Sequence, residues 1–360
     1  MRTIQASVSL VATLIWVGCD DSSQDWTVDI TSTSTPYRGA QNGGYYFQTP
    51  PPPWANETLT NPACGPPGEI FDKVYREKKN GYNPPYYRDS CNFPKFKIGK
   101  ESYSMVSVDT RGSDTRLFFT RDNWYVLKIQ DDHSPSAREM FWREHAAMLQ
   151  ARHTGVISVI EPNADLSLMS RECQSRSYVM RKVAGHDLST QVGVSQNLIM
   201  EIGRGALKIL EKFHDTGLIH GDIHLMNIML GSSLDVENSI KLIDFGRSMS
   251  YIHPSTGLHR NESELKPFTS IFTLNWNILS INELEGKAVS RADDIFRLAE
   301  VLITLCTREL KNFGRSSPRT VATQKRNRSF ESRVPHRLQE FYRYAMNIGF
   351  QERPNYKFLD

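Results

Sequence analysis

Two short segments in the second half of the chain place polar residues among aliphatic ones in a pattern that few folds would use. Residues 218–230 read LIHGDIHLMNIML, and residues 240–246 read IKLIDFG. In the first segment Asp222 and Asn227 are five positions apart, among aliphatic residues that would anchor a loop against a core. The second segment is typical of a short buried strand that ends at an acid, Asp244, and a glycine turn. The pattern predicts a loop and a turn that present polar side chains from one core.

These polar side chains are of the types that phosphoryl transfer from ATP requires. A carboxylate orients the attacking hydroxyl group, and an amide with a second carboxylate holds the metal ions that neutralise the phosphates. Asp222 would be the first carboxylate, and Asn227 and Asp244 would be ligands of Mg²⁺ or Mn²⁺. Either triplet alone, His-Gly-Asp or Asp-Phe-Gly, says little. In this order and at this separation they favour an enzyme that uses ATP.

With these two segments the sequence resembles the protein kinase superfamily. The resemblance covers about residues 96–360 of the sequence. It implies an α+β fold with two lobes, a small β-rich N-lobe over residues 95–183 and a larger helical C-lobe over residues 184–360. A length of 360 residues also exceeds one ordinary single-core domain.

The resemblance implies a lysine that grips the α- and β-phosphates of ATP and a glutamate that holds this lysine. Lys128, in the strand-like run 124–129, matches the lysine, although a surface lysine at a strand end would look similar. In the next helix Met140, Glu144 and Met148 recur at helical spacing, so Glu144 faces the core. Glu139 lies on another side of that helix. We therefore expect Lys128 to pair with Glu144.

Residues 98–106 stand where the resemblance places the glycine-rich loop over the phosphates. The segment keeps the first glycine and an aromatic residue, Tyr103, which we expect at the tip of the loop. Glu101 and Ser104 replace the other two glycines, and side chains there would hinder the approach of phosphate to backbone amides. The residues expected to contact the nucleotide here are Ile98, Gly99 and Val106.

Residues 177–185 match the fifth strand of the family and the hinge that follows it. Met180 would guard the back of the adenine pocket, and the backbone of Val183 would meet adenine. Asp187 would reach the ribose. Each of these residues could equally be an ordinary core or loop residue.

The region after residue 280 resembles the casein-kinase-I family in particular. That family has Ser-Ile-Asn, here residues 280–282, followed by an Arg-x-Asp-Asp helix start, here residues 291–294. The apolar positions of residues 295–303 independently predict a buried helix with Asp294 at its amino end. Arg353 would be the buried arginine that ties the lower lobe together. These features imply a protein substrate.

A run of basic residues near the C-terminus is compatible with an acidic or phosphate-primed substrate. Residues 315–337 hold seven basic residues against one acid, Glu331. Most such runs are solvated loops, but a surface that recognises phosphate or acidic groups is the alternative.

Two positions depart from the protein kinase pattern. Arginine usually precedes the catalytic aspartate and lysine follows it by two residues, whereas here they are Gly221 and His224. Without that arginine a phosphate on the activation loop has no obvious partner, so an active enzyme would be constitutively active. His224 could contact the γ-phosphate as lysine does. The pattern also resembles aminoglycoside and choline phosphotransferases, which act on small molecules.

The front of the chain predicts export. Residues 1–19 have the charge, apolar stretch and small-residue exit of a signal peptide, and residues 20–94 read as an arm rich in Pro, Tyr and Gly. An N-terminal helix of a cytosolic protein and a lipid-modified Cys19 are the alternatives. Cleavage after Cys19 would leave four cysteines, which allow three pairings. These four residues are Cys64, Cys91, Cys173 and Cys306.

Composition excludes several classes of protein. The net charge of +3 is too near balance for a general nucleic-acid binder, and no apolar run reaches the ~18 residues of a membrane span. The sequence gives no indication of oligomeric state. Three hypotheses remain: a secreted Ser/Thr protein kinase of casein-kinase-I type, a small-molecule phosphotransferase, and a non-catalytic kinase-like binding module. The first is favoured because Lys128, Glu144, Asp222, Asn227 and Asp244 are all present.

Overall fold

The structure is a computed structural model of the chain. It describes residues 95–98, 101–110, 115–120, 124–131, 135–152, 154, 156, 164–165, 175–191, 194–265, 276–307, 316–330 and 332–360. The expected signal peptide, the whole of the arm with Cys64 and Cys91, Gly99 and Cys173 lie outside these residues.

The first half of the described chain is an antiparallel sheet with one helix. The strands are ordered β5-β1-β2-β3-β4-β6, and every adjacent pair is antiparallel. Aromatic and β-branched residues in the central strands favour this pleated arrangement. The elements are β1 (Lys95–Ile98), β2 (Glu101–Thr110), β3 (Thr115–Thr120), β4 (Tyr125–Asp131), α2 (Pro135–Ala151), β5 (Ala164–Asp165) and β6 (Ser175–Arg181).

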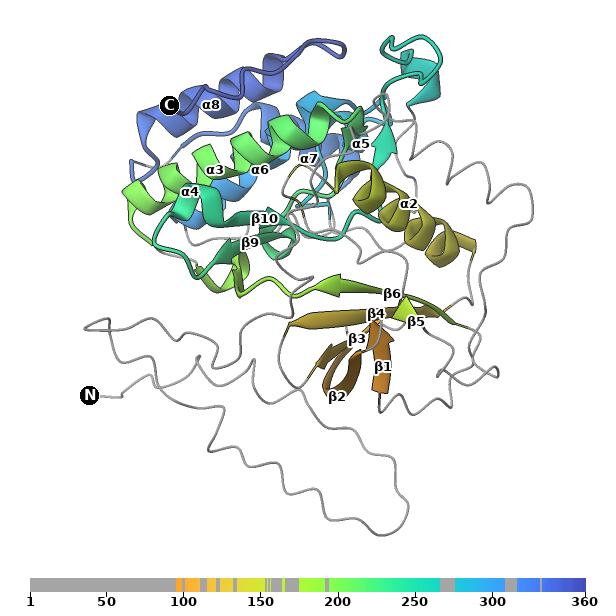
Figure 1. The fold of residues 1–360 in the computed structure, drawn as a ribbon. Helices are drawn as coiled ribbons and strands as arrows, with labels where there is room; N and C mark the ends of the chain where they lie inside the picture. Colours follow the sequence, from red (N-terminus) through yellow and green to blue (C-terminus); the bar gives the residue numbers. More distant parts are fainter. Residues whose placement is uncertain are drawn as a thin grey trace, which may run out of the picture. The chain divides into compact units, whose positions relative to one another are not determined.

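Helix α2 lies against the sheet through its apolar face (Figure 1). Phe141, Trp142 and Met148 are buried on that face. The ring of Phe141 lies 5.5 Å from that of Trp142 and 5.4 Å from that of Tyr178 in β6. This packing fixes the rotation of α2 about its axis, and with it the direction of every other side chain on the helix.

The second half is mainly helical, and α3 and α6 pack against each other at its centre (Figure 1). Ser195 caps α3 by accepting a hydrogen bond from the backbone N–H of Leu198. Nearly every residue of α6 is buried. The helices are α3 (Gln196–His214), α4 (Val236–Ser239), α5 (Ile281–Leu284), α6 (Arg291–Thr307), α7 (Pro318–Arg326) and α8 (His336–Asn347).

Short strands and 3₁₀ turns hold the loops between these helices. Strands β10, β9 and β7 form one small sheet, and β11 pairs with β8. The strands are β7 (Gly185–Asp187), β8 (Leu218–Ile219), β9 (Ile228–Gly231), β10 (Ile240–Leu242) and β11 (Met249–Ser250). The 3₁₀ turns are Leu188–Gln191, Leu225–Asn227 and Glu262–Glu264. This two-part α+β architecture is the fold class expected from the sequence.

Two expectations about the helical half are wrong. Arg353 is not buried: half of its side chain is exposed, and it pairs with Asp215 and Glu211 at the end of α3. The basic run is not one solvated surface, because the side chain of Lys325 is buried and Arg328 is nearly so. Both residues pair with the carboxylate of Glu300.

Two further findings concern the cysteines and the membrane. Cys306 is a free thiol, and partial burial raises its pKa to about 11. The described helices include none that is both long and apolar enough to span a bilayer.

Candidate active site

Lys128 and Glu144 form a buried ion pair between the sheet and α2. The Nζ atom of Lys128 lies 2.6 Å from Oε2 of Glu144, and both side chains are less than a tenth exposed. The contact expected from the helical spacing is therefore present. Glu139 instead pairs with Arg143, one turn along the same helix. Burial raises the pKa of Glu144, and the neighbouring Lys128 opposes that rise.

Asp244 comes to the same place from the helical half. Its Oδ1 atom lies 3.8 Å from Nζ of Lys128, and 43% of its side chain is exposed. Asp244 has a φ of 62°, in the left-handed region that residues other than glycine seldom adopt. The turn directs its carboxylate toward Lys128 and solvent, while the next residue, Phe245, is fully buried.

Asp222 and Asn227 are held together in the loop between β8 and β9. The Nδ2 atom of Asn227 donates hydrogen bonds to the backbone oxygen of Asp222 at 3.0 Å and to its Oδ2 atom at 3.3 Å. The amide oxygen of Asn227 therefore points the other way, as an acceptor. Asn227 is buried, and its backbone oxygen also accepts the N–H of Ile243, just before Asp244.

A magnesium ion fits these residues. Carboxylate and amide oxygens are its preferred protein ligands, and Mg²⁺ is usually held by one or two protein groups together with substrate phosphates. The exposed carboxylate of Asp244 and the outward amide oxygen of Asn227 supply such a partial set. In the described part of the chain no group of three or more His, Cys, Asp or Glu side chains forms a complete metal site.

The loop before Asp222 is fixed to the first turn of helix α6. Asp294 accepts the backbone N–H groups of His220 at 2.7 Å and of Gly221 at 2.9 Å. It also lies 2.9 Å from Nε2 of His214. Burial opposes ionisation of Asp294, but the hydrogen bond from His214 and the other donors outweigh it and lower the pKa. The expectation of Asp294 at the amino end of a buried helix is confirmed.

The ring of His220 is neutral and structural. Its Nδ1 atom accepts the backbone N–H of Asp222 at 3.2 Å, and its Nε2 atom lies 3.2 Å from the carbonyl oxygen of Ile243. Burial lowers the pKa of His220. The ring also packs against that of Phe245, with centroids 4.9 Å apart. His220 thus joins the loop that carries Asp222 to the turn that carries Asp244.

Positive charge surrounds the carboxylate of Asp222. Its Oδ1 atom lies 3.3 Å from Arg247 and 3.5 Å from Arg297. Its Oδ2 atom lies 3.7 Å from Nε2 of His224. Burial opposes ionisation, but the contact with His224 and the two guanidinium groups outweigh it and hold the pKa of Asp222 well below its usual range. Asp222 is therefore an anion throughout the range in which proteins normally work.

Sequence reasoning missed Arg247, Arg297 and Glu283, which bonds to both arginines. One signal was available: Arg297 falls on a helix predicted to be buried, three residues after Asp294, where an arginine needs an acidic partner. No spacing rule shows that this partner is Glu283.

The strand register corrects the expected position of Tyr103. Ile98 pairs with Glu101 and Phe96 with Tyr103. Tyr103 is thus inside β2 and not at the tip of the hairpin. Val106 falls where the register between β2 and β3 shifts, next to Met105.

The two strands that come before the lysine strand β4 in the sheet are β2 and β3. The neighbours of β4 are β3 and β6, and β3 pairs in turn with β2. In protein kinases the glycine-rich loop joins the two strands before the lysine strand. That connection is residues 111–114, which lie outside the described residues. Strand β1, with Ile98 at its end, is one strand farther from Lys128. The expected nucleotide contacts of Ile98 and Val106 stay predictions, and Gly99 lies outside the described residues.

The expected hinge residues follow the strand beside Lys128. Met180 pairs with Val126 of β4, and Met180 and Val183 are both partly buried. The carboxylate of Asp187 accepts the backbone N–H of Ser189 at 3.0 Å, so it caps the turn that follows. This bond stabilises the start of the turn at Leu188–Gln191. The expected contact of Asp187 with ribose stays a prediction.

Comparison with known families agrees with this geometry. Residues 98–357 match the family described as the protein kinase domain. The chain belongs to the protein kinase family. The match begins at residue 98, so the strands β2 to β4 and the loop that carries Asp222 and Asn227 lie within one kinase domain.

Individual relatives of this kinase-family chain include casein kinases. It is 29% identical over 180 residues to a casein kinase 1-like protein of Oryza sativa subsp. japonica, covering 47% of this chain and 25% of that protein. It is 28% identical over 170 residues to a probable casein kinase I homologue of Encephalitozoon cuniculi, covering 44% of this chain and 51% of that protein. The B1 kinase of Vaccinia virus is 26% identical over 214 residues, covering 54% of this chain and 66% of that protein. The chain spans about a quarter to a half of the first two relatives.

Proposed function

We propose that this chain is a Ser/Thr protein kinase of casein-kinase-I type, which transfers the γ-phosphoryl group of ATP to hydroxyl groups of proteins. The observation that carries the proposal is the arrangement of four side chains. Lys128 is paired with Glu144 at 2.6 Å and lies 3.8 Å from Asp244, and Asp222 lies in the neighbouring loop beside Arg247 and Arg297. Similarity to casein kinases supports protein as the substrate class.

Each side chain would have one task in the transfer. Lys128, held by Glu144, would bind the α- and β-phosphates, and Asp222 would orient the hydroxyl group of the substrate. Asn227 and Asp244 would hold Mg²⁺ or Mn²⁺, which neutralises charge on the phosphates. His224 would approach the γ-phosphate. Met180 and Val183 would contact adenine, and Asp187 the ribose.

The two alternatives stand on different residues. Gly221 and His224 support a small-molecule phosphotransferase. The binding-module alternative rests on Glu101 and Ser104, which replace two glycines of the expected loop and lie in β2. The presence of all five expected site residues favours catalysis over a binding module. They are Lys128, Glu144, Asp222, Asn227 and Asp244.

A direct assay tests the proposal. The purified chain is given labelled Mg-ATP with acidic and neutral Ser/Thr proteins, and in parallel with a panel of amino alcohols. We expect label on protein, lost in Asp222→Asn and kept in Asp235→Asn, because Asp235 caps α4 at an exposed site and asparagine caps equally well. Label on the small molecules alone would support the phosphotransferase. No transfer to either class would leave the binding module.

We also propose a preference for acidic or phosphate-primed substrates and export directed by residues 1–19. The first rests on the basic run, of which Lys325, Arg326 and Arg328 are already paired with acids of the same chain. Equal rates on acidic and neutral peptides would contradict it. Export rests on the sequence pattern alone, and a mature amino terminus at Asp20 in a secreted product would support it.

A further inference from the structure

Glu283 joins helix α5 to two arginines that reach the catalytic loop. It is the third residue of α5, and its Oε2 atom accepts the backbone N–H of Ser280 at 2.8 Å. The hydroxyl of Ser280 accepts the N–H of Glu283 in return, which makes a capping box. The carboxylate is therefore fixed by the backbone of its own helix, and its side chain is only 5% exposed.

Arg297 reaches Glu283 from helix α6. Its Nε atom donates to Oε2 of Glu283 at 3.0 Å, and its NH2 group donates to the same oxygen. Its NH1 group donates to the backbone oxygen of Gly221 at 2.6 Å and lies 3.5 Å from Oδ1 of Asp222. Burial opposes the charge of Arg297, but Glu283 and Asp222 outweigh it and raise its pKa. This guanidinium group stays charged.

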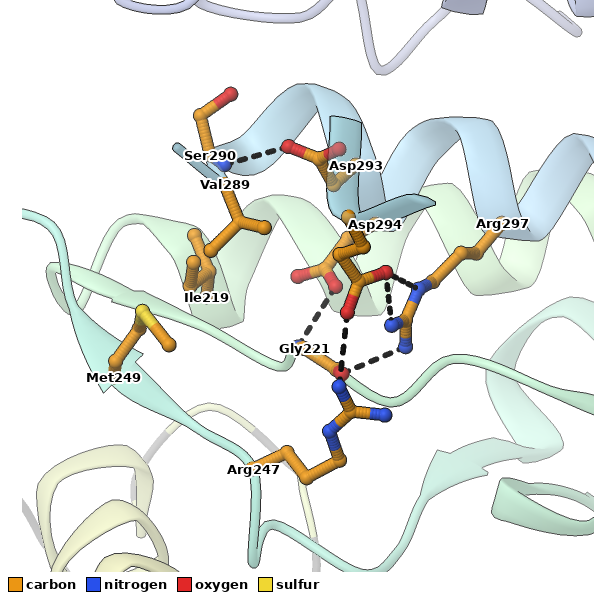
Figure 2. A pocket seen from close by; sticks show the side chains of 10 residues that line it. Ile219, Gly221, Arg247, Met249, Val289, Ser290, Asp293, Asp294 and Arg297 are labelled. Carbon is orange, nitrogen blue, oxygen red and sulfur yellow. Dashed lines mark hydrogen bonds and ion pairs between the residues drawn. The ribbon is translucent and has the colours of Figure 1, made fainter. Parts of the chain in front are cut away.

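Arg247 reaches the same two carboxylates from the turn after Asp244. Its NH2 group donates to Oε1 of Glu283 at 2.9 Å, and its NH1 group donates to Oδ1 of Asp222 at 3.3 Å. Figure 2 shows Arg247 and Arg297 directed at the same region beside Gly221. A Cβ atom on Gly221 would lie 2.7 Å from the backbone oxygen of Arg247, so the glycine lets the two segments approach.

The two oxygens of Asp222 consequently have different surroundings. Oδ1 faces two guanidinium groups that cannot lose their charge. Oδ2 faces the amide of Asn227 at 3.3 Å and His224 at 3.7 Å. The carboxylates of Asp222 and Glu283 balance the two guanidinium groups, and this pairing offsets part of the cost of taking the charges out of water. The orientation of Asp222 is thus set from α5 and α6, behind the reacting groups.

We propose that Arg247 and Arg297, tied together by Glu283, are positioning residues that fix Asp222 through Oδ1 and leave Oδ2 to meet the substrate hydroxyl. The inference rests on the proposed kinase function. Arg247, after the turn at Asp244, and Arg297, in α6, place beside Asp222 the positive charge that an arginine at position 221 would place there. They need no phosphate on the activation segment to do so.

The test compares transfer to protein with hydrolysis of ATP by water. In Arg247→Met and Glu283→Gln we expect the kcat of transfer to fall about 10-fold to 100-fold, because misplacement by about 1 Å costs this much. Hydrolysis should fall less, because a water molecule depends less than a bound protein hydroxyl on the exact position of Asp222. The KM for ATP should stay within about twofold, because the residues that bind the phosphates are unchanged. Arg247→Lys should be intermediate, since lysine cannot contact both carboxylates at once.

Controls separate a loss of position from a loss of fold. Arg353→Met removes an exposed, ion-paired arginine and should keep the wild-type ratio of transfer to hydrolysis. Folding is checked by thermal unfolding, and Glu283→Gln, which keeps the size of the side chain, serves as the test if Arg247→Met fails to fold. An active wild type with an unchanged ratio in both Arg247→Met and Glu283→Gln would overturn this inference alone. An inactive wild type would overturn the proposed function and the inference with it.

Discussion

Gly221 shows at the residue scale how one missing side chain shapes the catalytic loop. Its φ of 72° disfavours any side chain, and a Cβ atom would meet the backbone oxygen of Arg247 at 2.7 Å. Gly286 has a similar φ of 68° but no atom within 4 Å of such a Cβ. We expect Gly286→Ala to cost roughly 1 kcal/mol of unfolding free energy and Gly221→Ala roughly 2 kcal/mol or more. Urea denaturation measures both, and equal losses would show that the contact with Arg247 does not matter.

Asp293 gives a prediction about pH at the same scale. Burial raises its pKa to about 6, against the hydrogen bonds from Ser280 and Ser290. Because the folded state holds this proton more tightly than the unfolded state, stability from Asp293 is present below the unfolded pKa, near 4. It is lost as pH rises to about 6, with a ceiling of roughly 3 kcal/mol.

Asn cannot titrate, so Asp293→Asn should remove this dependence. Thermal unfolding from pH 4 to 7 should show the wild type losing stability relative to Asp293→Asn over that range. Parallel curves for the two proteins would contradict the assignment.

Helix α7 shows at the scale of elements why a basic run need not be a surface. The Nζ atom of Lys325 donates to the backbone oxygens of Asn277 at 2.9 Å and Leu279 at 2.7 Å, just before α5. Arg326, the next residue, pairs with Glu285 at the exposed side of the helix.

The two neighbours should therefore respond differently to substitution. Lys325→Met removes two hydrogen bonds and a buried ion pair with Glu300, and should cost about 3 kcal/mol of unfolding free energy. Arg326→Met removes a surface ion pair and should cost less than about 1 kcal/mol. Denaturant titration compares them, and a smaller loss for Lys325→Met than for Arg326→Met would be inconsistent with this packing.

The described part of the segment after Asp244 is held by strand pairing and by contacts of Tyr251. Strand β11 pairs with β8, and the hydroxyl of Tyr251 donates to the backbone oxygen of His214 at 2.7 Å. The guanidinium group of Arg291 stacks on the Tyr251 ring at 4.6 Å. We expect phosphatase treatment to leave kcat unchanged. Loss of activity on dephosphorylation, confirmed by mass spectrometry, would contradict constitutive activity.

Periodicity and motif spacing predicted a large part of these elements. The apolar face of residues 295–303 gave a buried helix, which is α6, and the phase of residues 140–148 placed Glu144 toward Lys128. The hairpin could not be assigned from glycine spacing, because register depends on strand pairing across the sheet. The exposure of Arg353 and the bonds between Glu283 and Arg297 depend on how helices pack, which local sequence does not fix.

At the scale of the whole molecule, the site joins the two halves of the fold. Lys128 and Glu144 come from the sheet and α2, while Asp222 and Asp244 come from the helical half. A ligand that contacts all of them should therefore stabilise the fold. Millimolar Mg-ATP at a dissociation constant of about 10 µM would add roughly 2.7 kcal/mol.

We expect this gain as a rise in melting temperature that chelation of Mg²⁺ largely removes. Asp244→Asn should lose the magnesium-dependent part of the rise, and Asp235→Asn should keep it. A full rise in the presence of a chelator would show that the nucleotide binds without the metal.

The close approach at Gly221 also bears on how this sequence could have diverged from other kinases. An arginine at position 221 would displace the backbone at position 247, and Arg297 would lose the carbonyl oxygen it binds. A lineage could not restore that arginine in one substitution without losing Asp222 alignment. Positions 221, 247, 283 and 297 should therefore be inherited as a set, and related sequences with arginine at 221 should have lost the acid at 283.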